Sequence, residues 1–117
     1  MKKIAIIFNH SPHGTAYGRE ALDAALALSA LHELSLFFLH EGIFHLLPNQ
    51  QPEHILARDY ISTLSMLELY DIEKIYVCSD DLTSFQLQDY KLNLNVQSVD
   101  RKTIKHYLDQ QDVILNF

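Results

Sequence analysis

Short apolar runs recur along the chain and are separated by polar turns and longer stretches of mixed character. Ile4–Phe8 is apolar at every position, which is typical of a strand in a parallel sheet that is covered on both faces. Similar runs follow, and we expect them to form the other strands: Leu34–Leu39, Ile75–Cys78, Val96–Val99 and Val113–Leu115. The pattern therefore predicts five short strands.

Between these runs the apolar positions repeat at helical spacing. We expect helices over Ala16–Leu31 and Ile55–Leu69, a short helix over Leu82–Leu87, and a last helix capped by Asp100. One apolar stripe of the first helix should face the sheet: Ala21, Ala24, Ala25, Leu28 and Leu31. Thr15 is the expected N-cap of this helix, and Ser79 or Asp80 that of the short one. In the last helix, Ile104, Tyr107 and Leu108 are expected to point inward.

The alternation of strands and helices predicts the fold class. Strand followed by helix, repeated along the chain, gives an α/β domain of three layers with a five-stranded, mostly parallel sheet. Neither a repeat nor a linker interrupts the pattern, so we expect one domain over residues 1–117.

The segment Glu41–Pro48 is unusual because large apolar residues occupy a place where a turn is expected. In one interpretation it is a helical turn tucked back on the core. In the other, Ile43–Leu47 is an exposed apolar loop that meets another subunit, since contiguous exposed apolar patches mark interaction sites. The sequence leaves both interpretations open.

Charge and composition narrow the class of protein. A net charge of −6 and a pI near 5.5 argue against direct binding of nucleic acid, which needs clustered Lys and Arg. No apolar run approaches the about 20 residues of a membrane helix. The apolar run after Met1-Lys2-Lys3 is also too short for a signal peptide. With a single cysteine, the chain fits a reducing compartment, and we expect a cytoplasmic protein.

Most chemical motifs are missing from the sequence. Gly14 and Gly18 alone do not make a phosphate-binding loop, and a nucleophile elbow of the G-x-S-x-G type is absent. His10 and His13 stand three residues apart without a nearby Cys or carboxylate pair, so we expect no metal site and no cofactor. Asp80 and Asp81 are adjacent and more typical of helix capping than of a shared proton.

Cys78 is the candidate for chemistry, with two interpretations. It lies at the predicted end of the third strand, on the edge of the sheet that also carries His10 and His13. A cysteine before a helix N-terminus is a candidate persulfide carrier or nucleophile, because the helix dipole and a protonated histidine both favour the thiolate. Asp80 and Asp81 follow at once, however, and negative charge near a thiol disfavours its ionisation. A cysteine buried for structural reasons is the alternative.

Several segments together resemble a known family, and they are spread over the whole chain. They are Ser11–Ala24, Glu41–Pro48, Ala57–Ile61, Leu69–Glu73, Val77-Cys78 and Asp112–Leu115. In combination they resemble the DsrE/DsrF-like family, and within it the TusC-like, DsrF-like subunits of the bacterial TusBCD sulfur-relay complex.

The resemblance implies a DsrE/DsrF-like fold and a cytoplasmic heterohexamer with two copies each of TusB-like, TusC-like and TusD-like chains. It also implies contact, through the complex, with TusA-like and TusE-like sulfur carriers, and a role in 2-thiolation of the tRNA wobble uridine. The relay cysteine of the family belongs to the TusD-like subunit, where small residues and then arginines follow it. Here Ser79-Asp80-Asp81 follow Cys78, so the resemblance implies a mainly structural subunit with no assigned catalytic residue. The competing hypothesis is a self-sufficient small sulfurtransferase with Cys78 as persulfide carrier.

Overall fold

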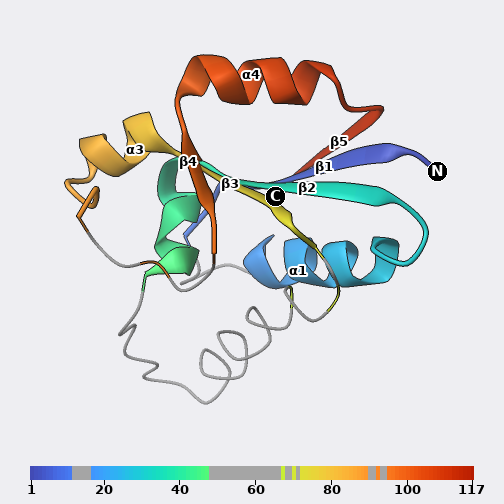
Figure 1. Ribbon diagram of the computed structural model, residues 1–117. Helices are drawn as coiled ribbons and strands as arrows, with labels where there is room; N and C mark the ends of the chain where they lie inside the picture. Colours follow the sequence, from blue (N-terminus) through green and yellow to red (C-terminus); the bar gives the residue numbers. More distant parts are fainter. Residues whose placement is uncertain (12–16, 48–66, 68–69, 71, 90–91, 93–94) are drawn as a thin grey trace.

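A parallel sheet of five strands forms the centre of the molecule, in the order β4-β3-β2-β1-β5 (Figure 1). The computed structural model describes residues 1–11, 17–47, 67, 70, 72–89, 92 and 95–117. The strands are β1 (Lys3–Phe8), β2 (Glu33–Phe38), β3 (Lys74–Cys78), β4 (Gln97–Val99) and β5 (Val113–Asn116). The helices described are α1 (Tyr17–Leu28), the 3-10 helix η1 (His40–Leu46), α3 (Ser79–Ser84) and α4 (Arg101–Asp109). The pairings between these strands are all parallel, which confirms the predicted α/β class.

β1 is an interior strand of the sheet, because β2 pairs with one of its edges and β5 with the other. Ile6 is opposite Leu36 on β2 and Leu115 on β5. Residues 4–8 are all buried, as the unbroken apolar run predicts. Since side chains alternate between the two faces of a strand, Ile6 packs into one core and Ala5 into the other.

Helices cover both faces of the sheet, so the domain has three layers (Figure 1). On one face, α1 and η1 pack against Ile4, Ile6 and Phe8 of β1 and their neighbours on β2. On the other face, α4 places Ile104 against a smaller cluster that includes Phe37 and Cys78. Among the described residues, no helix has both the length and the apolar character needed to cross a membrane.

α1 ends three residues earlier than predicted, at Leu28. The chain turns there because the N–H of Glu33 must reach the carbonyl of Lys2 to start the pairing of β2 with β1, and Leu31 is left 70% exposed in the turn. The predicted stripe is therefore wrong at Leu31. Leu22, which the predicted stripe omits, is buried together with Ala21 and Ala25.

The segment after β2 is the helical turn of the first interpretation. Ile43 and Leu46 of η1 are fully buried, so the interpretation of Ile43–Leu47 as an exposed apolar loop is wrong. Gly42 permits this packing, because a β-carbon there would overlap the carbonyl oxygen of Phe8. Phe44, also in η1, is partly buried, and its ring packs on the ring of Phe85 with 4.9 Å between the ring centres.

Two predicted caps have different outcomes. Asp100 caps α4 as expected, because its Oδ1 accepts the N–H of Thr103 at 2.8 Å. α3, in contrast, begins directly at Ser79 with Cys78 as N-cap residue, so the predicted start at Leu82 and the caps at Ser79 or Asp80 are wrong. The strand passes into the helix without a turn. The predicted cap Thr15 and the predicted helix Ile55–Leu69 lie outside the described residues, apart from Leu67, which is buried.

Candidate functional site

The carboxyl ends of β2 and β3 meet the beginnings of η1, α3 and α4 at one edge of the sheet. Cys78 ends β3, and Asp81 lies in the first turn of α3. One residue separates His40, which begins η1, from the end of β2, and one residue separates Arg101, which begins α4, from the end of β4. We call these four residues the carboxyl-edge cluster. In parallel α/β sheets this edge is where ligands and partners bind, which makes the cluster the first candidate site.

Asp81 is the centre of the carboxyl-edge cluster. Its Oδ2 accepts the backbone N–H of His40 at 2.7 Å, and its Oδ1 accepts the guanidinium of Arg101 at 2.9 Å. The Asp81 side chain is only 7% exposed, whereas that of Arg101 is 65% exposed. Burial works to raise the pKa of Asp81, but the His40 N–H, the Cys78 thiol and Arg101 together hold it below its ordinary value. The carboxylate is therefore charged and joins three elements.

His40, whose backbone N–H bonds Asp81, has an unusual backbone conformation. His40 has a φ of 51°, in the left-handed region that residues other than glycine seldom adopt. This conformation turns the chain from β2 into η1, and the hydrogen bond from its N–H to Asp81 stabilises the turn.

Cys78 is a free cysteine whose side chain points into the core under α4. It is 1% exposed, and burial is the largest cause that raises the pKa of its thiol. The neighbouring carboxylate of Asp81 raises this pKa further, while the backbone N–H groups of Asp81 and Asp80 lower it. The balance favours the thiol over the thiolate, which is the nucleophilic form.

Asp80 has a different role from Asp81. Its Oδ2 accepts the backbone N–H of Arg101 at 2.9 Å, so it caps α4 and not its own helix. Asp100 supplies the second cap of α4 through Thr103. The prediction that the acidic pair caps a helix is therefore correct for Asp80, but the helix that Asp80 caps is α4 and not α3, to which it belongs.

Of the two histidines named from the sequence, His10 does not join the carboxyl-edge cluster. The ring of His10 stacks on Tyr17, with 4.5 Å between the ring centres, and His13 lies outside the described residues. Within the described part of the chain, no three His, Cys, Asp or Glu side chains are grouped as metal ligands would be.

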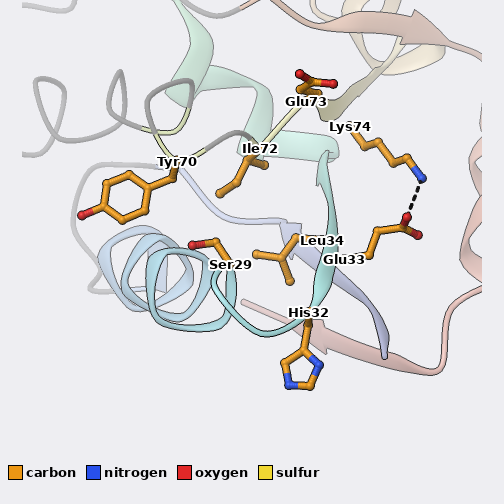
Figure 2. Close-up of a pocket in the computed structure, with 8 residues that line it drawn as sticks. All are labelled: Ser29, His32, Glu33, Leu34, Tyr70, Ile72, Glu73 and Lys74. Atoms are coloured by element: carbon orange, nitrogen blue, oxygen red, sulfur yellow. Dashed lines mark ion pairs between the residues drawn. The ribbon is translucent and has the colours of Figure 1, made fainter. Parts of the chain in front are cut away.

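A separate pocket of 230 Å³ lies at the opposite, amino edge of the sheet, where β2 and β3 begin (Figure 2). Leu34 and Ile72 line it together with Tyr70, while Lys74 and Glu33 form an ion pair of 3.3 Å at its rim. Both side chains of this pair are well exposed, so the ion pair contributes little to stability.

The sequence alone does not reveal the central role of Asp81. Its partner His40 is 41 residues away, and Arg101 is 20 residues away in the other direction. One signal was available, because adjacent strands of a parallel sheet bring their carboxyl ends together. The residues after β2 and β3 are therefore neighbours once the strand order is known.

Comparison with known proteins places the chain in a family. Residues 2–117 match the sequence model of the DsrE/DsrF-like family. The chain belongs to the DsrE/DsrF-like family. The expectation drawn from the segments around Ser11–Ala24 and Glu41–Pro48 is thereby confirmed at the level of the family.

Among solved structures, this DsrE/DsrF-like chain is similar to the YchN protein from E. coli. The two share 21% sequence identity, the alignment covers 100% of each chain, and the TM-score is 0.83. A likeness at this identity shows a common fold. The three-layer, five-stranded architecture is thus the DsrE-like fold predicted from the sequence.

Proposed function

We propose that this chain is a TusC-like subunit of a cytoplasmic sulfur-relay complex, and that its own part in the relay is mainly structural. The complex would pass persulfide sulfur towards 2-thiolation of the tRNA wobble uridine. Membership of the DsrE/DsrF-like family supports the general assignment. The segments that resemble TusC-like chains support the specific one.

The structural role rests on the surroundings of Cys78. A sulfur carrier needs an accessible thiolate, whereas this thiol is 1% exposed and lies against the charged Asp81. Asp81 is itself bonded to the first residues of η1 and α4, so its carboxylate is engaged in contacts that join elements of the fold. These features favour a subunit that positions its neighbours over one that carries sulfur.

The partners follow from the same proposal. They are TusB-like and TusD-like chains in a heterohexamer with two copies of each subunit, and TusA-like and TusE-like carriers that reach the complex. Native mass spectrometry of the chain co-expressed with the chains encoded beside it tests the assembly. We expect a complex with equal numbers of three different chains. A stable monomer that binds neither neighbour would contradict the proposal.

Replacement of the Cys78 thiol tests whether this chain carries sulfur itself. In Cys78→Ser the complex should assemble, and tRNA thiolation should stay within about twofold of the wild type, because Cys78 does not hold the persulfide sulfur that is transferred. Asp23→Asn, at an exposed position of α1, is the matched surface control. Loss of thiolation from an assembled Cys78→Ser complex would contradict the structural role and make Cys78 a persulfide carrier, which is the premise of the second candidate, a self-sufficient small sulfurtransferase. The N–H groups of α3 that face Cys78 are the observation in favour of that candidate.

A further inference from the structure

β5 is an outer strand of the sheet, and its edge away from β1 has no neighbour among the described strands. The ladder between β5 and β1 continues to Phe117, which donates its N–H to the carbonyl of Ile7 at 3.0 Å and accepts the N–H of Asn9 at 3.1 Å. Both main-chain groups of Phe117 therefore face β1. Since successive residues of a parallel strand direct these groups to alternate sides, those of Asn116 and Ile114 face the open edge.

The open edge of β5 lacks the features by which natural proteins protect an outer strand. Such edges usually carry charged side chains, a proline or a bulge. Val113–Asn116 contains neither a charged residue nor a proline, and its pairing with β1 is regular from end to end. Val113 and Leu115 pack against the core, whereas Ile114 points to the other face and is 49% exposed. An unprotected edge with an exposed isoleucine is suited to the addition of a further strand.

We propose that the open edge of β5 binds β5 of a second copy of this chain in antiparallel orientation, so that two sheets join into one. The self-complementarity of the edge favours this occupant. With Leu115 of both copies at the twofold axis, Ile114 of each copy lies opposite Asn116 of the other. A hydrogen-bonded antiparallel pair exchanges two N–H to carbonyl bonds. The two such pairs therefore satisfy every outward N–H and carbonyl of Ile114 and Asn116.

The neighbouring register is less favourable. An axis at Ile114 would place Asn116 opposite Asp112, and the N–H of Asp112 already donates to the carbonyl of Lys3 at 2.7 Å. One carbonyl of Asn116 in each copy would then lack a donor, so the register centred on Leu115 is the one that we expect. A heterohexamer with two copies of this chain can contain the same contact, but the inference stands on the edge of β5 and does not depend on the sulfur-relay assignment.

Sedimentation velocity of the purified chain over a range of concentrations tests the pairing. We expect a reversible dimer. Ile114→Pro removes an outward N–H without touching the bonds to β1, and an outer strand tolerates proline at such a position. By symmetry this variant deletes two of the four bonds across the axis, so its dimer should dissociate at least about tenfold more readily.

Ile114→Val is the matched control, because it keeps both the N–H and a β-branched side chain. Its dissociation constant should stay within about threefold of the wild type. Circular dichroism and urea unfolding establish that each variant is folded. A chain that is monomeric at every concentration, or an Ile114→Pro variant that dimerises as tightly as the wild type, would overturn the proposal.

Cross-linking tests the register. Opposite residues of a hydrogen-bonded antiparallel pair have Cα atoms about 5.5 Å apart, which a disulfide can span. Oxidation of a mixture of Ile114→Cys and Asn116→Cys chains should therefore link one variant to the other. Either variant alone should cross-link less, because its new thiols lie diagonally across the axis. Cys78 is 1% exposed and should stay out of the reaction. Equal cross-linking of each variant with itself would overturn the register.

Co-expression of Ile114→Pro with the chains encoded beside it separates this inference from the proposed function. A purified wild-type dimer that recruits no neighbouring chain would support the β5 contact and contradict the sulfur-relay subunit. A wild-type chain that is monomeric alone, and whose Ile114→Pro variant fails to join its neighbours, would mean that a strand of another protein occupies this edge. That result would overturn the pairing of two copies and leave the assembly of the complex standing.

Discussion

The buried imidazole of His45 donates a hydrogen bond from Nε2 to the carbonyl oxygen of His10 at 2.8 Å. His45 belongs to η1, and His10 follows β1, so the contact joins two connections at the carboxyl edge that are 35 residues apart. The ring is 1% exposed and packs edge-on against Phe8. A carbonyl can only accept, so the tautomer at this site carries its proton on Nε2.

Truncation of this side chain should destabilise the protein. His45→Ala removes the ring from a buried site and leaves the His10 carbonyl without this donor, so we expect a loss of about 3 kcal/mol in the free energy of unfolding. Urea unfolding followed by circular dichroism measures it. His106→Ala, at an exposed position of α4, is the control and should change stability by no more than about 0.5 kcal/mol. Equal stabilities of the two variants would contradict the packing described for His45.

A β-carbon at position 42 should also be costly. Gly42→Ala places a methyl group against the carbonyl oxygen of Phe8, so η1 must move away from the end of β1. We expect a loss of about 2–4 kcal/mol, in the range of overpacked or strained sites. The exposed neighbour Glu41→Ala is the control and should stay near the wild type in the same urea titration. A Gly42→Ala variant of unchanged stability would show that the backbone approach is looser than described.

The local sequence pattern was enough to predict the strands, because an unbroken apolar run such as Ile4–Phe8 is typical of a parallel strand that is buried on both faces. The role of Asp100 as the cap of the last helix could likewise be predicted, because its partner Thr103 is only three residues away in the sequence. The error at Leu31 arises from the pairing of the strands, which the helical pattern does not contain. Leu31 is periodic with the helix, but the register between β1 and β2 ends the helix before it.

The candidate site was harder to predict than the fold. Cys78 and the two aspartates could be picked out as neighbours in sequence, and the burial of Asp81 could not. That burial depends on His40 and Arg101, which reach the cluster only through the strand order of the sheet. For the same reason, the apolar residues Ile43 and Leu46 could not be assigned to core or surface from their pattern alone.

Asp81 should make stability depend on pH in the acid range. Its folded pKa lies below the ordinary value of 3.8, so the unfolded chain binds the proton more tightly. The stabilisation is then present above about pH 4 and is lost as the pH falls through the folded pKa. At pH 6, Asp81→Asn should be less stable than the wild type by about 2 kcal/mol, and the difference should narrow towards pH 3. Urea titrations across this range measure it, and a constant difference would contradict the assignment.

Cys78 and Tyr76 should make stability fall in the alkaline range. Burial raises the pKa of Cys78 above its ordinary 9.0 and that of Tyr76 above 10.0, so in each case the folded state holds the proton more tightly. This stabilisation is complete below the unfolded pKa and is lost as the pH rises through the folded one, at no more than about 1.4 kcal/mol per pH unit for each group.

The double variant Cys78→Ala with Tyr76→Phe isolates this alkaline effect. Between pH 8 and about 10.5 its guanidinium midpoint should fall less than that of the wild type, because two of the linked protons are gone. Tyr17→Phe, at an exposed ring, serves as the control and should follow the wild type. Parallel curves for the double variant and the wild type would show that other groups cause the alkaline loss.

The position of β5 beside β1 has a consequence for synthesis on the ribosome. The two strands pair in parallel, with Ile4 opposite Val113, and the N–H of Lys3 donates in addition to Asp112 Oδ2 across a separation of 109 residues. Until β5 emerges, β1 has one neighbour, and its other edge offers unpaired backbone groups beside five buried apolar residues. The nascent chain thus keeps one edge of β1 unpaired until residues 113–116 emerge, so slow decoding before Val113 would lengthen its exposure to aggregation or to chaperones.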